Sequence, residues 1–117
     1  MTASSRFTSA AAEPPVAGDR PSIVAAKRYG NQLITSGQTA HVDGTNIANG
    51  VVGAEVDLET ARKCAWQCSA NVVAAALAEL GDLEQITEVT RVTVYVASTP
   101  DFTDQHLVGD AATLYFH

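Results

Sequence analysis

Ser36 and Gly37 are the residues in this sequence best suited to contact a small ligand. A serine hydroxyl can donate or accept a hydrogen bond, and a glycine leaves the neighbouring backbone N–H groups open because it has no Cβ. The pair could therefore bind a small polar molecule. A Ser-Gly step is also a common way for a strand to bend, so the two residues alone leave both roles open.

Two histidine–carboxylate pairs could take part in proton transfer. His41 is followed closely by Asp43, and His106 lies four residues before Asp110, a spacing that brings side chains together on a helix. A nearby carboxylate can tune an imidazole to titrate near neutral pH. Such residues are more often solvated on loops and helix surfaces, and we favour that interpretation for both pairs.

The only cysteines, Cys64 and Cys68, are four residues apart. On a helix their side chains would point the same way from successive turns. Two thiolates are too few for the tetrahedral sites that metals such as zinc prefer, and no Cys or His nearby in the sequence completes a set. The pattern favours small packing residues over a disulfide or a metal site.

Composition predicts one soluble globular domain, since 46% of the 117 residues are hydrophobic and 17% are charged. The formal net charge is −6, and the scattered Lys and Arg residues form no basic stripe, so nucleic acid is not the favoured partner. No apolar run approaches the roughly 20 residues that span a bilayer, and the first residues lack the pattern of a signal peptide. We therefore expect a cytoplasmic protein that makes no membrane contact.

The N-terminal part of the chain divides into a tail and a hairpin. Residues 1–21 are rich in Ala, Ser and Pro without an apolar period, which predicts a flexible tail ahead of a domain at 22–117. Ile23–Tyr29 and Gln32–Gln38 are strand-like runs around the Gly30-Asn31 pair, which suits a tight hairpin turn.

A loop and a long helix are expected next. Residues 39–56 contain several glycine turn signals and few large side chains, which predicts a loop with at most one short strand. Asp57 can cap a helix from Leu58 to Leu80, and Gly81 suits the left-handed conformation that follows a helix. Apolar residues recur along this helix at helical spacing, and many are alanines, so it can lie close to a sheet.

Residues 88–97 predict a half-buried strand. Val92, Val94 and Val96 alternate with Thr93, Tyr95 and Ala97, so the valines share one face.

A second helix is predicted over residues 102–117, after the break at Thr99-Pro100-Asp101. Its apolar side would carry Leu107, Ala111, Leu114 and Tyr115. The sequence stops with two aromatic residues and no glycine cap, and we therefore expect that it is cut inside a helix.

Several motifs resemble the beginning of the RidA (YjgF, endoribonuclease L-PSP) family. Ile34-Thr35-Ser36-Gly37-Gln38 is similar to the family's strand motif, and Pro100-Asp101-Phe102-Thr103-Asp104-Gln105 is similar to a motif of one of its branches. The Gly30-Asn31 turn, the Asp57-Leu58 helix start and the Val92–Val96 strand occur in the same order. The resemblance covers the predicted domain.

The resemblance implies an α+β fold similar to that of chorismate mutase. Two helices would cover one face of a mixed sheet, and the last strands would be missing from this chain. It also implies a homotrimer with clefts between subunits, which suit a small-molecule substrate.

The usual activity of the family is hydrolytic deamination of reactive 2-imino and enamine acids. This chemistry needs a cation to anchor the substrate carboxylate, a positioned water and a group that moves protons. It requires neither a metal nor an organic cofactor. Some family members have been labelled endoribonucleases or translation inhibitors.

The family's site residues carry over only in part. Its motif serine matches Ser36, which Gly37 follows, whereas its first-strand tyrosine falls on Ile23 and its helix asparagine on Asp110. The family's arginine and glutamate would lie beyond His117. The resemblance therefore implies a substrate-binding role for Ser36, Gly37 and Asp110 and assigns no catalytic residue.

Three hypotheses follow. The first is an imine or enamine deaminase, and the second is a noncatalytic trimer that binds a small molecule or acts as a scaffold. Ile23 cannot donate a hydrogen bond and Asp110 would repel a carboxylate, which favours the second. An endoribonuclease is a third hypothesis that rests on family labels and is opposed by the acidic charge.

Overall fold

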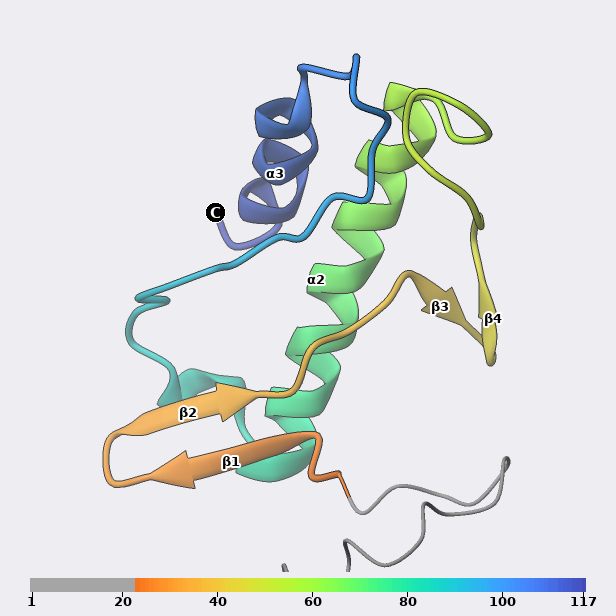
Figure 1. The fold of residues 1–117 in the computed structure, drawn as a ribbon. Helices are drawn as coiled ribbons and strands as arrows, with labels where there is room; N and C mark the ends of the chain where they lie inside the picture. The colour runs from red at the N-terminus through yellow and green to blue at the C-terminus, as the bar shows by residue number, and fades with distance from the viewer. Residues whose placement is uncertain (1–22) are drawn as a thin grey trace, which may run out of the picture.

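The computed structural model describes residues 23–117, which form two helices, a short 3-10 turn and two small antiparallel sheets (Figure 1). The predicted α+β class and the two helices are confirmed. Instead of one mixed sheet, the described residues form two separate pairs of strands. The predicted tail, residues 1–21, lies outside the described residues. Among residues 23–117, no helix combines the length and hydropathy needed to cross a membrane.

The first sheet is the predicted hairpin, with strands β1 (Ala26–Tyr29) and β2 (Gln32–Thr35). Gly30 in the turn has φ 57°, a conformation that glycine adopts without strain. Both strands are shorter than predicted. The backbone hydrogen bond from the Ser36 N–H to the Ala25 carbonyl (2.8 Å) is the last one between the two arms of the hairpin.

The second sheet corrects the prediction of a loop with at most one short strand. Strands β3 (His41–Val42) and β4 (Thr45–Asn46) form a small hairpin whose turn residues have positive φ angles. Val52, further along, donates its N–H to the Ala97 carbonyl (2.9 Å) and accepts from the Thr99 N–H (3.0 Å). The loop is therefore tied to the segment that leads into the second helix.

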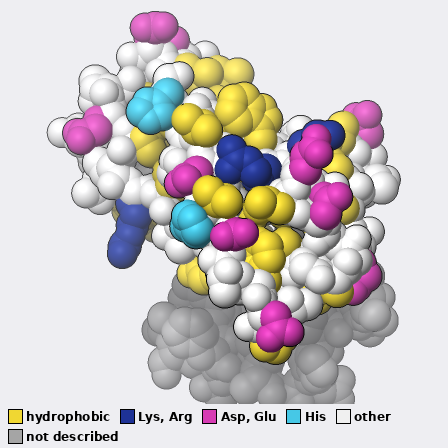
Figure 2. Space-filling model, turned by 90° about the horizontal axis from the view of Figure 1, so that it is seen from above, with side chains coloured by type: hydrophobic (Ala, Val, Ile, Leu, Met, Phe, Trp, Pro, Cys, Tyr) yellow, Lys and Arg dark blue, Asp and Glu magenta, His cyan; other side chains and the backbone are white. Residues whose placement is uncertain are grey.

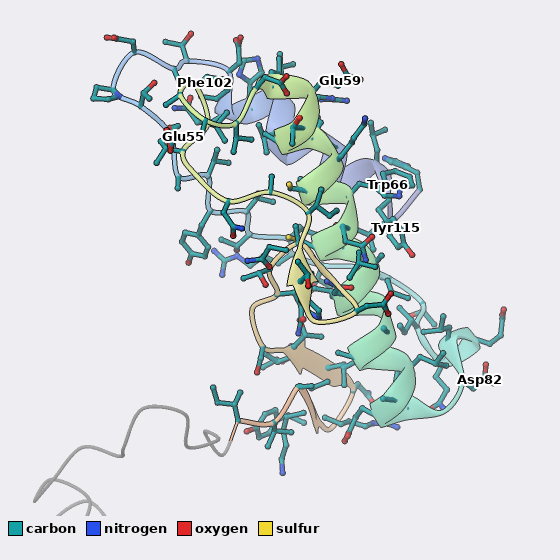
Figure 3. The ribbon with its side chains drawn as sticks, turned by 90° about the vertical axis from the view of Figure 1, so that its right-hand side faces the viewer. Glu55, Glu59, Trp66, Asp82, Phe102 and Tyr115 are labelled. Carbon is teal, nitrogen blue, oxygen red and sulfur yellow. The ribbon has the colours of Figure 1, made fainter. Side chains whose placement is uncertain are left out.

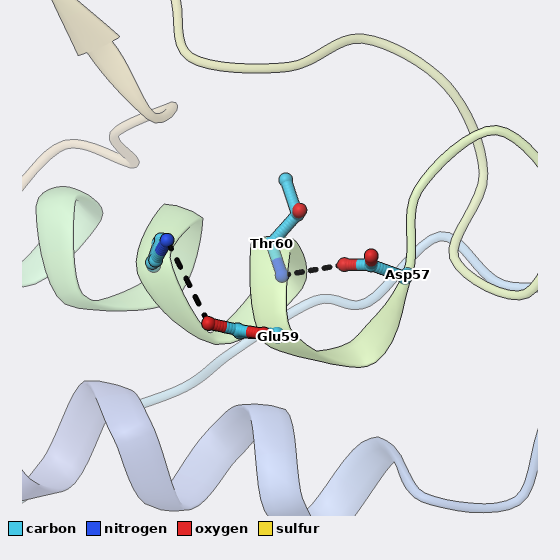
Figure 4. A network of polar contacts seen from close by, with 4 residues as sticks. Asp57, Glu59 and Thr60 are labelled. Atoms are coloured by element: carbon cyan, nitrogen blue, oxygen red, sulfur yellow. Dashed lines mark hydrogen bonds and ion pairs between the residues drawn. The ribbon is translucent and has the colours of Figure 1, made fainter.

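The long helix α2 (Leu58–Leu80) has the predicted ends. An Asp57 carboxylate oxygen accepts from the Thr60 backbone N–H at 2.8 Å, as Figure 4 shows beside the exposed Glu59–Lys63 ion pair. The Thr60 bond holds the pKa of Asp57 below its ordinary value. At the other end Gly81, at φ 77°, donates to the Leu77 carbonyl.

A short 3-10 turn, η1 (Leu83–Gln85), follows α2. Helix α3 (Gln105–Leu114) is shorter than the predicted helix over residues 102–117. The predicted apolar side of α3 was also partly wrong. Val108, Ala111 and Ala112 are its buried residues, whereas Leu114 is 51% exposed. The buried face of α3 consists of these small residues because they let α3 approach α2 closely.

The main core lies between α2 and α3, where small side chains allow close approach. Ala61 and Ala65 of α2 pack in one cluster with Val108 and Ala112 of α3. Ser69, only 3% exposed, donates to the Ala112 carbonyl at 2.8 Å. Figure 1 shows α3 beside the N-terminal half of α2 and the β1–β2 hairpin near its other end.

Residues 88–97 do not form the predicted strand. The segment is extended, but within residues 23–117 the only strand-type bridge in this region joins Val52 to Ser98, just after it, and Ala97 contributes its carbonyl to that bridge. The predicted alternation holds only in part and without a ladder: Val94 and Val96 pack against the core and Tyr95 is 92% exposed, but Val92, predicted on the valine face, is also exposed. Side-chain pattern alone sets the faces of a strand, but a ladder also needs a neighbouring backbone.

Candidate functional site

A cavity of about 680 Å³ is the candidate site. It lies between the N-terminal half and middle of α2, the connection Thr35–Ala40 and the extended segment Val92–Ala97 (Figure 1 shows these three segments). Small residues of α2 form one wall: Ala61, Cys64, Ala65, Cys68 and Ser69. Amide side chains of Gln38, Asn46 and Asn49 add hydrogen-bonding groups.

Ser36 and Gly37 line this cavity just after the end of β2. The Ser36 hydroxyl donates to the Val24 carbonyl at 2.5 Å, so in this arrangement it can only accept from a ligand. A Cβ built on Gly37 would meet no atom within 4 Å. Gly37 therefore leaves free space beside the serine.

Asp110, the third predicted site residue, borders a different cavity. This second cavity, about 840 Å³, lies on the α3 side of Val92–Ala97 and is also lined by Gln105, His106 and Thr113. Ser36, Gly37 and Asp110 do not line a common cavity within one chain. His106 and Asp110 share this cavity wall, but no hydrogen bond or ion pair joins them among the described side chains.

His41 belongs to a polar network that fixes the cavity rim to α2. The Asn71 amide donates to the carbonyls of Thr39 (2.9 Å) and His41 (3.1 Å), and it lies 3.3 Å from His41 Nδ1. Gln67 in turn donates to the Asn71 side-chain oxygen at 3.0 Å. Asn71 was not recognised from the sequence, although an asparagine among the alanines of an amphipathic helix is a signal for a polar contact.

Cys64 and Cys68 are free, half-buried and on the cavity wall. Burial raises the pKa of both thiols, and the neighbouring Cys64 raises that of Cys68 further. Both are therefore neutral thiols near pH 7, which agrees with a packing role. In the described part of the chain, no group of three His, Cys, Asp or Glu side chains could hold a metal ion.

The cavity wall is mostly apolar and carries no charged side chain. Among the described residues that line it, none is Lys, Arg, His, Asp or Glu. Acidic side chains are instead spread over the surface, as the view from the top of the molecule shows (Figure 2). The described wall alone offers neither a cation for a substrate carboxylate nor a group that exchanges protons readily at neutral pH.

An aromatic cluster lies where the end of α3 meets α2. The rings of Trp66 and Tyr115 meet edge to face at 4.9 Å, and Tyr115 meets Phe116 at 5.8 Å (Figure 3 labels the first two). Phe116 also lines the cavity, whereas Trp66 and Tyr115 do not, and the contact with Tyr115 gives Trp66 a packing role.

This chain is similar in sequence and in fold to known proteins. No family model matches the sequence. The protein TCP17 of Trypanosoma cruzi is 32% identical over 100 residues, which are 86% of this chain and 62% of that protein. The structure of Atu1372 from Agrobacterium tumefaciens, a protein of unknown function, matches with a TM-score of 0.78 and 38% identity over 81% of this chain and 61% of that one.

A third protein, from Shewanella oneidensis and provisionally named an endoribonuclease, matches with a TM-score of 0.73. The two sequences are 22% identical, and the match covers 96% of this chain and 75% of the Shewanella protein. At this level of identity the similarity concerns the fold alone. The chain thus has the RidA-like α+β fold expected from its motifs. It spans about three fifths of the length of the Trypanosoma and Agrobacterium proteins.

Proposed function

We propose that this chain provides the small-molecule-binding wall of a RidA-like protein that hydrolyses 2-imino and enamine acids at the interface of a homotrimer. The observation that carries the proposal is the position of Ser36 and Gly37, at the end of β2 on the wall of a large cavity. The RidA-like fold and the resemblance of the surrounding motif support the same role. We propose a cytoplasmic location for this reaction.

Imine hydrolysis in this cavity would need two groups from outside its described wall. A cation must neutralise the substrate carboxylate, and an acid–base group must move protons as water adds to the C=N carbon. The resemblance implies an arginine and a glutamate from further strands, and in a trimer a neighbouring subunit could bring them close. The Ser36 oxygen, whose hydrogen points to Val24, would accept a hydrogen bond from the iminium N–H.

A noncatalytic small-molecule-binding trimer is the second candidate. It is favoured by the uncharged cavity wall and by Ile23, which occupies the family's tyrosine position and is 69% exposed. Such a cavity suits a neutral, partly apolar ligand better than a carboxylate. An endoribonuclease, the name given to the Shewanella protein, is disfavoured by the net charge of −6 because RNA phosphates would be repelled.

The test measures the decay of a 2-imino acid generated in place from its amino acid by an oxidase. The purified chain and the full Agrobacterium protein are compared with buffer, and the proposal predicts faster decay with the full protein. In the Agrobacterium protein, alanine at the position aligned with Ser36 should lower the rate at least about tenfold, as expected when a positioned polar contact is lost. Thr45→Ala in this chain, outside the cavity wall, controls for nonspecific effects on binding.

Binding of the stable analogue 2-oxobutanoate separates the two candidates. Two results together would favour the noncatalytic protein. The first is binding of the analogue that Ser36→Ala weakens and Thr45→Ala does not, and the second is no imine turnover by the full protein. Absence of both turnover and binding would exclude the deaminase, and it would also exclude a noncatalytic protein that binds 2-oxo acids. The circular dichroism spectrum of Ser36→Ala must match that of the parent, because the substitution also removes the bond to Val24.

A further inference from the structure

The connection between the two hairpins carries Ser36 and Gly37, and it is attached to the rest of the molecule at both ends. At its start the Ser36 N–H donates to the Ala25 carbonyl at 2.8 Å. At its far end the Asn71 amide of α2 donates to the Thr39 carbonyl at 2.9 Å. The two residues between these attachments belong to no strand. The conformation of the cavity wall beside Ser36 therefore depends on Asn71.

The orientation of the Asn71 amide is fixed by its partners. Its nitrogen faces two backbone carbonyls, those of Thr39 (2.9 Å) and His41 (3.1 Å), which can only accept a hydrogen bond. Its oxygen accepts from the Gln67 side chain at 3.0 Å. An amide placed the other way round would set oxygen against oxygen at both carbonyls. Asn71 therefore presents only N–H donors to β3.

The same amide nitrogen also faces the His41 ring. His41 Nδ1 lies 3.3 Å from the Asn71 nitrogen and 3.5 Å from Thr39 Oγ1. Because the amide nitrogen can only donate, Nδ1 is the ring nitrogen without a hydrogen, and the neutral ring carries its hydrogen on Nε2. A proton on Nδ1 would set two donors against each other. The Thr39 hydroxyl can turn to accept from it, whereas the Asn71 amide cannot.

Few other ionisable groups lie on the elements packed against His41. In the described chain, β3 packs on α2 and pairs with β4 (Figure 1). Strand β4 has no ionisable side chain, the turn before it contributes Asp43, and α2 contributes only Cys68 within one turn of Asn71. Among the described residues, no hydrogen bond or ion pair joins Asp43 or Cys68 to the His41 ring. A proton on this ring would therefore act first on the Asn71 amide.

We propose that Asn71 is a positioning residue for the Ser36–Thr39 connection, and that it holds this connection on α2 only while the His41 ring is neutral. Histidine changes its charge between about pH 5 and 8, so acid would weaken the attachment of Thr39 and His41 to the helix. The β3–β4 hairpin has only two residues in each strand, which is too few to hold its position without α2. The cavity would then lose its ordered wall beside Ser36.

For ligand binding this inference rests on the proposed function, because the ligand is taken to lie beside Ser36. Asn71 and His41 do not line the cavity, and they act through the position of Thr39 and the residues before it. A connection released at one end has to be ordered again by the ligand, and Gly37 has more backbone freedom to lose than other residue types. Release should therefore weaken binding about tenfold. The attachment itself can be measured without a ligand.

The test uses nuclear magnetic resonance of the whole nitrogen-labelled chain between about pH 7.5 and about pH 5.5. At the higher pH we expect the His41 ring to carry its hydrogen on Nε2. The Ile47 amide, which donates to the Ala40 carbonyl at 2.8 Å, should then be protected from hydrogen exchange. At the lower pH this protection should fall at least about tenfold, and 2-oxobutanoate should bind about tenfold more weakly.

Three variants separate the roles of the two residues. His41→Asn can place an amide oxygen near the position of Nδ1 and does not titrate, so it should keep protection and binding at both pH values. Asn71→Asp has no side-chain N–H at neutral pH and should lose both at either pH. Gln67→Ala is the matched control on the same helix, since it leaves both carbonyl bonds of Asn71 in place and should behave as the parent does.

The inference is wrong if acid lowers the protection of Ile47 equally in the parent and in His41→Asn, or lowers it in neither. It is also wrong if Asn71→Asp keeps the protection of the parent. Failure of 2-oxobutanoate to bind the parent at either pH would count against the proposed function instead, and the exchange of Ile47 would still decide the inference. If Asn71→Asp does not fold, the comparison of the parent with His41→Asn decides it.

Discussion

The two ends of α2 differ in how completely the described residues cover them. On the N-terminal half, α3 buries Ala65 to 4% exposure and satisfies Ser69 through the Ala112 carbonyl. Near the C-terminal end, the hairpin leaves Ile34 56% and Tyr29 60% exposed. Helices complete their own backbone hydrogen bonds and need only a packing surface, whereas strands need further strands before their faces and edges are covered.

Overpacking the helix pair should give the largest effect. Ala111→Leu adds three carbon atoms on the buried face of α3, outside both cavities, and it should lower the free energy of unfolding by about 2–3 kcal/mol. Urea denaturation followed by circular dichroism measures the change. Ala78→Leu is the control on the exposed side of α2, with an expected change below about 0.5 kcal/mol. Equal effects would show that the helix contact is not tightly packed.

A substitution at Gly53 probes the contact between the loop and the extended segment. Gly53 has φ +98°, and an added Cβ would lie 2.6 Å from Thr99 Oγ1, so Gly53→Ala should cost about 1–2 kcal/mol for the backbone and more for the collision. Gly44→Ala, at φ +83° with nothing within 4 Å, is the matched control for backbone strain alone.

The collision itself is tested by removing the Thr99 hydroxyl. Thr99→Ala should recover part of the loss in the Gly53→Ala background and should leave Gly44→Ala unchanged. No difference between the two glycine variants would show that the loop moves away from Thr99 freely.

The smallest effect is expected at the helix cap. Asp57→Ala removes the acceptor for the Thr60 N–H and should lower the melting temperature, whereas Asp57→Asn keeps an acceptor. The bond to Thr60 holds the folded pKa of Asp57 below its ordinary value of 3.8. Its contribution is therefore present above pH 3.8 and is lost as the pH falls through the folded pKa.

The pH dependence of the melting temperature separates the contribution of the Asp57 charge from that of the hydrogen bond at the cap. Melting curves between neutral pH and pH 2 should show that the advantage of the parent over Asp57→Ala shrinks with acid. The asparagine variant has no carboxyl to protonate, so its own advantage over the alanine variant should stay constant. An advantage of the parent that does not change with pH would contradict the role of the ionised carboxylate.

The predictions that held depend on short stretches of sequence. Asp57 and Gly81 define both ends of α2, and Gly30 defines the hairpin turn. The second helix was less well predicted, because α3 selected a face of small residues that fits α2 and left Leu114 exposed. That choice depends on the partner helix rather than on the sequence of α3 alone.

The candidate site could be predicted only in part for a related reason. The motif indicated Ser36 and Gly37, and both line the central cavity. Their separation from Asp110 depends on the path of Val92–Ala97, which runs between the two cavities. The cavity rim is fixed by Asn71 across a gap of 32 residues to Thr39, and no local pattern predicts such a contact.

The sequence by itself determined the caps, the hairpin turn and the alternating faces of residues 93–97, because backbone propensity and side-chain period act over a few residues. The tertiary structure alone decided which face of α3 is buried, where Asp110 lies and whether residues 88–97 join a ladder. Each of these depends on atoms brought close from distant parts of the chain. Strand pairing depends on them most, since half of its hydrogen-bonding groups belong to another segment.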